Sequence, residues 1–316
     1  MSYSFETVYR TSTYALQKQS YELARLQEQM ATGSAINRAS DAPSDANRIM
    51  ALTSNTKELD HFVNQIDSLS SKLDVASSLL SMTSEQITDF RADFTRAMSM
   101  GKEQRQATAT GIDDLLESLV SLANTEREGQ RFFGGEDSVS IPYVVERSGG
   151  QLTQVTYQGS YSTRKIEVAP NVEVSSVFVG EEVFREDARQ APKILNGDTG
   201  LKVGAGTASA QGFKEVEVTH DGTNYQLQIK GSSEIVTVPT GGETNTAVTD
   251  SRTGKVIYFD TTNLNSTGTE SVNIPGTHDM FNLLIKIRDY LNSPEDVEPQ
   301  LYALADSLTD VHEKLV

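Results

Sequence analysis

The sequence predicts an α+β multidomain fold: a long antiparallel, coiled-coil-like helical rod with one or two β-rich domains inserted at its distal end. Two patterns predict this fold. Glycine is absent between Ser34 and Met100, whereas 12 of the 22 glycines lie between Asn196 and Gly276. Glycine weakens a helix interior by about 1 kcal/mol relative to alanine and suits turns. Apolar residues also alternate at spacings of three and four from Leu59 onward, which favours left-handed coiled-coil packing.

The long helix is predicted from about Ala42 to Ser99, a length of about 85 Å at 1.5 Å per residue. Pro43 suits its first turn, where no partner for an N–H group is needed, and Ser40 or Asp41 can cap it. The apolar positions that we expect to form the seam of the rod are Leu59, Phe62, Ile66, Leu69, Leu73, Leu80, Ile87, Phe90 and Phe94.

A shorter amphipathic helix precedes the rod and ends at Gly33, the residue type favoured just after a helix. An amphipathic helix without a partner is marginal in water, so its apolar side needs cover. We expect that side to be an assembly interface, formed by Leu16, Leu23, Leu26 and Met30.

The end of the chain is also helical. Thr277 is a plausible cap for a returning helix, and Asp279 is favourable at its positive end. We expect the returning helices to pack antiparallel to the rod. The sequence stops at Leu315-Val316 in the middle of a heptad. Either another chain covers the first helix, or the natural protein continues past Val316.

Two β-hairpins are predicted in the glycine-rich middle. The first joins residues 143–145 to 152–157 around Gly149-Gly150, and the second joins 215–220 to 224–229 around an Asp-Gly turn. With the helices, these elements divide the chain into five segments. We expect an assembly helix and linker (1–41), the helical rod (42–130), a β-rich domain (131–188), a second inserted β-rich domain (189–276) and the returning helices (277–316).

Composition excludes several functions. Lys+Arg 27 against Asp+Glu 44 gives a formal net charge of −17, which disfavours nucleic-acid and membrane-surface binding. No apolar run approaches the ~18–20 residues of a membrane-spanning helix, and no secretory signal peptide is visible. Cysteine is absent, which removes disulfides and thiolate chemistry. We therefore expect neither nucleic-acid binding nor membrane insertion.

No catalytic constellation is visible. Asp113-Asp114 and Glu181-Glu182 are adjacent carboxylates that point to different faces, so we expect them on solvated surface. The four histidines lack metal-ligand spacing. The sequence predicts no catalytic, cofactor-binding or metal-binding residues and no enzymatic activity, which leaves surfaces for association.

Several motifs resemble the flagellin superfamily. Residues 26–33 (Leu-Gln-Glu-Gln-Met-Ala-Thr-Gly), then Ser40-Asp41-Ala42-Pro43 and a long helix, resemble its N-terminal signature. Residues 122–125 with 129–135 are similar to the place where the helices of these proteins give way to a β domain. The segment around Pro43 resembles the hook–filament junction branch of this superfamily, because flagellins tend to have the sequence Asp-Asp-Ala-Ala-Gly at these positions. The resemblance covers residues 1–188 and 277–316.

The resemblance implies a structural adapter subunit at the hook–filament junction of the bacterial flagellum. Implied partners are other copies of the chain in a ring, the upstream hook-associated junction protein, flagellin and a cytoplasmic export chaperone. The resemblance also implies that the chain is exported through the flagellar type III pathway to the extracellular flagellum, without a cleaved signal peptide. The terminal helices of the family are disordered in free monomers. Family members continue beyond the position of Val316, so we expect a chain truncated at its C-terminus.

Two other functions remain open. A flagellin or minor filament subunit would share the N-terminal signature. A surface-binding module of a different class would use the coiled coil as a stalk and present residues 189–276 to a carbohydrate or host protein.

Overall fold

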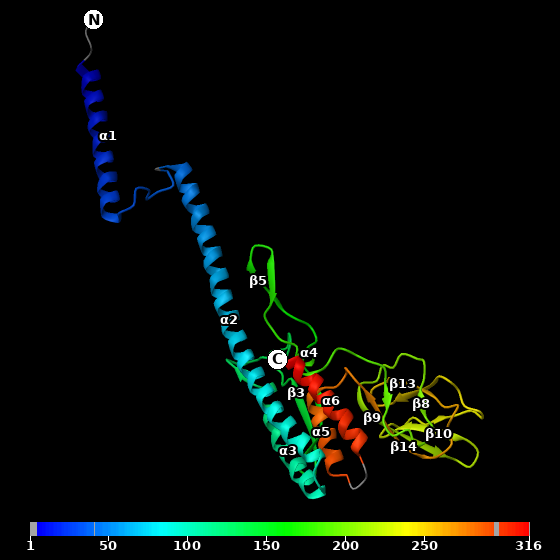
Figure 1. The fold of residues 1–316 in the computed structure, drawn as a ribbon. Helices are drawn as coiled ribbons and strands as arrows, with labels where there is room; N and C mark the ends of the chain where they lie inside the picture. Colours follow the sequence, from blue (N-terminus) through cyan, green and yellow to red (C-terminus); the bar gives the residue numbers. More distant parts are fainter. Residues whose placement is uncertain (1–4, 41, 294–296, 316) are drawn as a thin grey trace. The chain divides into compact units, whose positions relative to one another are not determined.

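The structure is a computed structural model that describes residues 5–40, 42–293 and 297–315 (Figure 1). The chain forms two compact units, residues 1–67 with 167–172 and residues 68–166 with 173–316. The predicted fold class is confirmed, because N-terminal helices are followed by antiparallel β-rich regions and by two returning helices. The division into five segments stays a prediction.

The first unit contains α1 (Phe5–Thr32) and the beginning of α2 (Pro43–Met98). Gly33 follows α1 with φ +68°, the left-handed conformation predicted for it. Ala46 N–H donates to the carbonyl of Ala42, so Ala42 occupies the cap position of α2 and Ser40 does not. Two other residues of the sequence predictions, Asp41 and Val316, lie outside the described residues.

The second unit contains the rest of α2 with α3 (Lys102–Ala123), α5 (Met280–Leu291) and α6 (Glu298–Leu315). The four helices share one apolar core with the first β-hairpin. Arg91 of α2 contacts Thr309 at 2.9 Å, whereas Ser84, earlier in α2, contacts His312, later in α6. The order of these contacts shows that α6 runs antiparallel to α2.

Two polar residues have explanations that the sequence did not supply. Thr83, which interrupts the apolar spacing of α2, is buried and donates from Oγ1 to the carbonyl of Leu79 at 2.9 Å. Asp279 is itself the cap of α5, where its carboxylate accepts from Asn282 N–H at 2.8 Å. Capping by Thr277 was a wrong prediction, because its hydroxyl donates to the carbonyl of Ile274 and accepts from Gly212 N–H.

The first β-rich region follows α3. Asn124 at the end of α3 bonds both backbone groups of Tyr143, with its amide donating at 2.8 Å and its carbonyl accepting at 2.9 Å. The hairpin of β3 and β4 has the predicted turn, with Gly149 at φ +60° and Gly150 at φ +90°. The elements of this region are β1 (Glu126–Arg127), β2 (Gln130–Arg131), β3 (Tyr143–Ser148), β4 (Gln151–Tyr157), β5 (Lys165–Ala169), β6 (Val172–Ser175) and α4 (Gly180–Phe184).

The second β-rich region consists of a five-stranded sheet in the order β11-β10-β9-β14-β7 and a three-stranded sheet in the order β12-β13-β8. Both sheets contribute to one apolar core, so they pack face to face. The predicted Asp-Gly hairpin joins β9 to β10. The strands are β7 (Lys193–Ile194), β8 (Lys202–Val203), β9 (Gly212–His220), β10 (Tyr225–Ile229), β11 (Val236–Thr237), β12 (Thr246–Asp250), β13 (Lys255–Asp260) and β14 (Gly268–Ile274).

Polar contacts fasten the sheets to the helices. The hydroxyl of Tyr290 on α5 donates to Glu215 of β9 at 3.0 Å. Arg288 is 4% exposed and bonds Asp113 of α3 and the carbonyl of Leu152, each at 2.7 Å. The expected solvated surface position of Asp113 was therefore wrong. Glu181 likewise pairs with Arg185 and is not a free surface carboxylate.

A buried acid lies where the second β-rich region meets α5. Glu186 is 6% exposed and accepts from His278 N–H at 3.3 Å, while its Oε1 has no hydrogen-bond partner. Burial raises the pKa of Glu186 to about 7. The ring of His278 contacts Asn273 at 2.6 Å, and burial lowers the pKa of His278 to about 4. Glu186 is therefore the group of this cluster that titrates near neutral pH.

Replacing Glu186 by Gln should alter how stability depends on pH. Because the folded pKa is raised, the proton on Glu186 favours the folded state at low pH, and this contribution is lost as pH rises through 7. The free energy of unfolding of E186Q relative to the unaltered chain should therefore rise by about 1 kcal/mol from pH 6 to pH 8. Urea unfolding of both chains at pH 6 and at pH 8 measures this difference in the free energy of unfolding. Glu182→Gln, which alters an exposed carboxylate of the nearby α4, should show no such change, and equal behaviour of the two variants would contradict the assignment.

The seam residues of α2 in the second unit should differ in their effect on stability. Ile87 is 0% exposed and Leu73 is 45% exposed. Ile87→Ala leaves a cavity and should lower the free energy of unfolding by about 2–5 kcal/mol. Leu73→Ala removes a side chain that is already half in water and should cost less than about 1 kcal/mol. Denaturant midpoints of the two variants test this difference.

Candidate assembly interface

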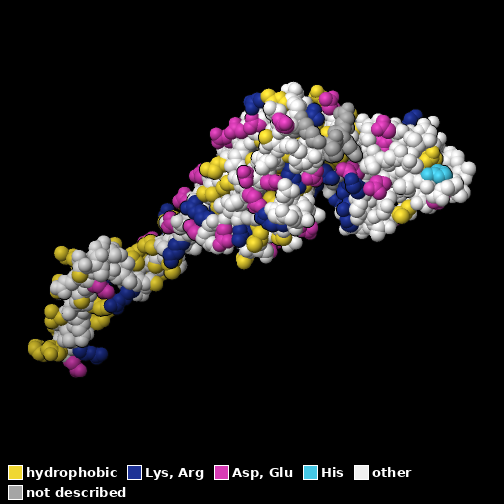
Figure 2. Space-filling view, turned by 90° about the horizontal axis from the view of Figure 1, so that it is seen from below, with side chains coloured by type: hydrophobic (Ala, Val, Ile, Leu, Met, Phe, Trp, Pro, Cys, Tyr) yellow, Lys and Arg dark blue, Asp and Glu magenta, His cyan; other side chains and the backbone are white. Residues whose placement is uncertain are grey.

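The helix α1 presents its apolar side to solvent. It has 28 residues and none of them is buried. The predicted interface residues Leu16, Leu23 and Leu26 are 66%, 60% and 56% exposed, and Met30 is 85% exposed. Figure 2 shows hydrophobic side chains gathered over these N-terminal helices. The described part of the chain gives this side of α1 no apolar cover.

The apolar side of α1 is longer than predicted. Phe5 and Tyr9 are exposed and continue the spacing of three and four towards the N-terminus. The signal was present in the sequence, but Ser12 and Gln19 occupy two of the heptad positions and interrupt it. We call Phe5, Tyr9, Leu16, Leu23, Leu26 and Met30 the α1 stripe.

The exposure of the predicted seam residues changes along α2. Leu59 and Ile66 in the first unit are 61% and 47% exposed, and Ile49 and Leu52, which sequence reasoning did not select, are exposed as well. Phe62 and Leu69 are buried, Leu73 is exposed and Leu80 is half-buried. The last three seam residues, Ile87, Phe90 and Phe94, are buried in the helical core.

Two shallow grooves follow α2 in the second unit. One, of about 560 Å³, is lined by the seam residues Leu73 and Leu80 together with Phe178 and Leu315. The other, of about 540 Å³, lies between α2 and α3, with Phe90 among its lining residues. Their mixed apolar and polar linings suit side chains of a packed helix better than a small cofactor.

Chemical sites are not evident elsewhere. Within residues 5–40, 42–293 and 297–315, no group of three or more His, Asp or Glu side chains is placed to hold a metal ion. None of the described helices combines the length and apolar character that crossing a membrane requires. What the arrangement offers is apolar helix surface at heptad spacing, which packs against other helices.

Comparisons with known proteins agree with this geometry. Residues 7–137 match the family described as the bacterial flagellin N-terminal helical region. The chain is 22% identical over 187 residues to flagellar hook-associated protein 3 of Escherichia coli (strain K12), which covers 58% of this chain and 57% of that protein. The chain thus spans little more than half the length of this curated relative.

Two solved structures share the fold. A flagellar hook-associated protein-3 from Legionella pneumophila has a TM-score of 0.55 at 19% identity, covering 84% of this chain and 88% of that one. The flagellar junction protein FlgL from Legionella pneumophila has a TM-score of 0.52 at 18% identity, covering 85% and 94%. These matches agree with the resemblance of the sequence to the flagellin superfamily. Over residues 7–137 the chain is similar to the bacterial flagellin N-terminal helical region, and it shares the fold of the two solved structures.

Proposed function

We propose that this chain is a structural adapter subunit at the hook–filament junction of the bacterial flagellum. The observation that carries the proposal is the α1 stripe, whose apolar side chains are exposed on a helix without a single buried residue. Soluble monomers seldom expose a continuous apolar surface of this kind, and such a surface marks an interaction site.

Helix packing supplies the mechanism. A helix of 28 residues is marginal alone in water and gains stability when another helix covers its apolar side. The heptad spacing of the α1 stripe fits side-by-side packing with a second helix of similar pattern. At about 25 cal/mol per Å² of buried apolar surface, a few hundred Å² per neighbour suffices to hold subunits together without a cofactor.

The partners follow from this function. We infer that α1 packs against other copies of the chain in a ring, against the upstream hook-associated junction protein and against flagellin. Before export, a cytoplasmic chaperone covers the same apolar surface. The chain then leaves the cell through the flagellar export pathway without a cleaved signal peptide and becomes part of the extracellular flagellum. The names of its relatives, which refer to a flagellar hook-associated and a junction protein, support this proposal.

We also infer a structural and not a catalytic function. Binding energy here comes from helix surfaces distributed over α1 and the first half of α2. The adjacent carboxylates that could be taken for an acid–base pair are engaged otherwise, since Asp113 and Glu181 each pair with an arginine.

Substitution of the α1 stripe tests the function. The triple variant Leu16→Gln, Leu23→Gln, Leu26→Gln should leave the thermal unfolding of the chain nearly unchanged, because none of the three side chains is buried. In a bacterium whose own junction protein has been deleted, this variant should be exported into the medium but should fail to support filament growth. Swimming in soft agar and electron microscopy of hooks and filaments measure the effect.

A matched control lies on the opposite side of the same helix. Arg10→Gln, Lys18→Gln and Arg25→Gln alter exposed polar residues and should leave swimming unchanged. Normal filaments with the stripe variant would contradict the adapter function. Incorporation of the unaltered chain along the whole filament would instead favour a filament subunit, and ligand binding by residues 189–276 without incorporation would favour a surface-binding module.

A further inference from the structure

A cluster of basic side chains lies on the second unit, apart from the α1 stripe. We call it the basic patch and define it as Arg185, Arg189, Lys214, Arg252 and Lys255. The residues come from the segment after α4, from β9, from the turn after β12 and from the start of β13. These elements are brought together where the two sheets of the second β-rich region meet.

One buried carboxylate fixes part of the basic patch. Asp250 is 0% exposed, and its side chain pairs with Lys214 Nζ at 3.2 Å and with Arg252 Nε at 3.0 Å. These pairings lower the pKa of Asp250 to about 2 against the opposing effect of burial. Lys214 and Arg252 are therefore held in place by an anion that itself has no access to solvent.

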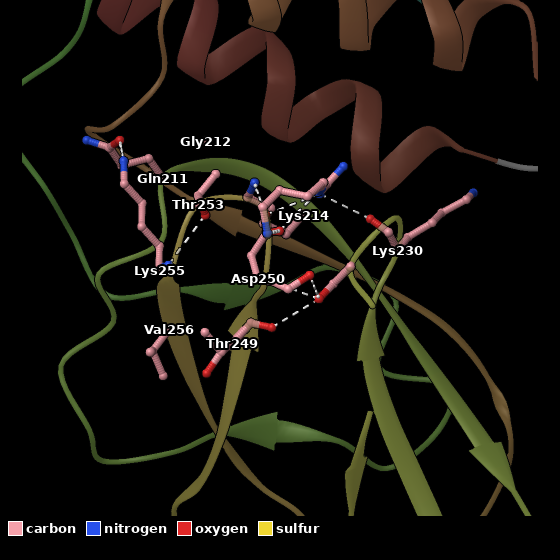
Figure 3. Close-up of polar contacts among 12 residues, drawn as sticks. Gln211, Gly212, Lys214, Lys230, Thr249, Asp250, Thr253, Lys255 and Val256 are labelled. Atoms are coloured by element: carbon pink, nitrogen blue, oxygen red, sulfur yellow. Dashed lines mark hydrogen bonds and ion pairs between the residues drawn. The ribbon is translucent and has the colours of Figure 1, made fainter. Parts of the chain in front are cut away.

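Two cations of the basic patch have no carboxylate partner among the described residues. Lys255 donates to the side-chain carbonyl of Gln211, and Figure 3 shows its chain directed to Gln211 while Lys214 is directed to Asp250. The guanidinium of Arg189 donates to backbone carbonyls, among them those of Ala208 at 3.1 Å and Ala210 at 2.8 Å.

Positive charge is in excess here, because the five cations of the basic patch pair with three carboxylates among the described residues, Asp250, Glu181 and Asp279. Burial lowers the pKa of Lys255, and the positive charges of Arg185, Lys214 and Arg189 lower it further, whereas the negative charge of Glu181 opposes them. An anion placed beside Lys255 would relieve this repulsion, so the basic patch is an attractive site for a carboxylate. Such a patch is unusual in a chain with a formal net charge of −17.

The opposite excess occurs on α6. Asp306, Asp310 and Glu313 follow one another at spacings of four and three on the exposed side of this helix, and Tyr302 extends the same side by one turn. Burial and the negative charges of Glu313 and Asp306 raise the pKa of Asp310. We call Asp306, Asp310 and Glu313 the acidic stripe. Its carboxylates repel one another as the cations of the basic patch do.

We propose that the basic patch of one copy of this chain binds the acidic stripe of a second copy. The contact joins two different surfaces of the same unit, so it is heterologous and repeats from copy to copy. A heterologous contact closes into a ring when its rotation is suitable. This inference rests on the proposed function, in which copies of the chain stand side by side, and it assigns the second β-rich region and α6 a part in that assembly.

Charge complementarity favours a second copy of the chain as the partner that binds the basic patch. Each copy has a formal net charge of −17, so copies repel one another except where the basic patch meets a carboxylate-rich face. The contact therefore fixes the orientation of neighbouring subunits more than it adds affinity. It is also sensitive to salt, in contrast to packing through the α1 stripe.

Charge reversal tests the contact in the full chain. Self-association is measured by analytical ultracentrifugation at about 50 mM and about 500 mM NaCl, which span strong and weak electrostatic interaction. Lys255→Glu, and separately Asp306→Lys with Glu313→Lys, should each weaken association at low salt roughly fivefold or more. The chain that carries all three substitutions should regain part of the association, because the carboxylate introduced at position 255 of one copy can pair with the lysines introduced on α6 of the next. Lys202→Glu, an exposed lysine outside the basic patch, should have no effect.

Lys255→Met is the control for effects on folding. It keeps the length of the side chain, removes its charge and should also weaken association. Circular dichroism should match the unaltered chain for every variant. Equal association of K255E, K202E and the unaltered chain would overturn the inference, as would a triple variant no better than its parents. These outcomes leave the proposed function standing, since that function fails only if the α1 stripe variant supports normal filaments.

Discussion

The helical part of this protein depends on burying one narrow apolar stripe of α2. Residues at spacings of three and four lie along one side of the helix, so the stripe is buried wherever other helices pack along that side. In the second unit α3, α5 and α6 supply that cover, and Ile87, Phe90 and Phe94 lie in a common core. At the other end of α2, Leu59 and Ile66 keep the same spacing without comparable burial. The difference separates a part of the helix that stabilises the fold from a part whose apolar side chains stay exposed.

The apolar α1 stripe and the charged surfaces of the second unit differ in what they could contribute to the proposed assembly. In the proposed assembly, apolar packing through the α1 stripe carries little orientational information, because leucine side chains pack in many registers. The proposed contact between the basic patch and α6 would supply direction, since it joins two surfaces of opposite charge. The buried Asp250 keeps Lys214 and Arg252 positioned in advance, which lowers the entropy that a contact would otherwise lose on ordering them.

Local signals in the sequence predicted much of the fold. Gly33 ends α1, Pro43 begins α2, and the two hairpins turn at Gly149-Gly150 and at an Asp-Gly pair, because each of these requires only the conformation of its own residues. The pairing of β14 with both β9 and β7 could not be predicted in the same way. It depends on contacts between distant segments, which short-range patterns do not encode.

The candidate sites show the same division. The heptad spacing identified Leu16, Leu23, Leu26 and Met30, all exposed, but polar Ser12 concealed the extension to Tyr9. Asp113 was misjudged because its partner Arg288 is 175 residues away along the chain. The basic patch was missed for a similar reason, since its members come from segments that no short motif connects.

Asn124 has a mechanical consequence. Its single amide bonds both the N–H and the carbonyl of Tyr143, so the last turn of α3 and the first residue of β3 are joined through one short, planar group. A hydrogen-bonded pair of this kind resists rotation as well as separation. A twist applied along α3 would therefore pass directly into the β3–β4 hairpin, without first being absorbed by a slack connecting loop.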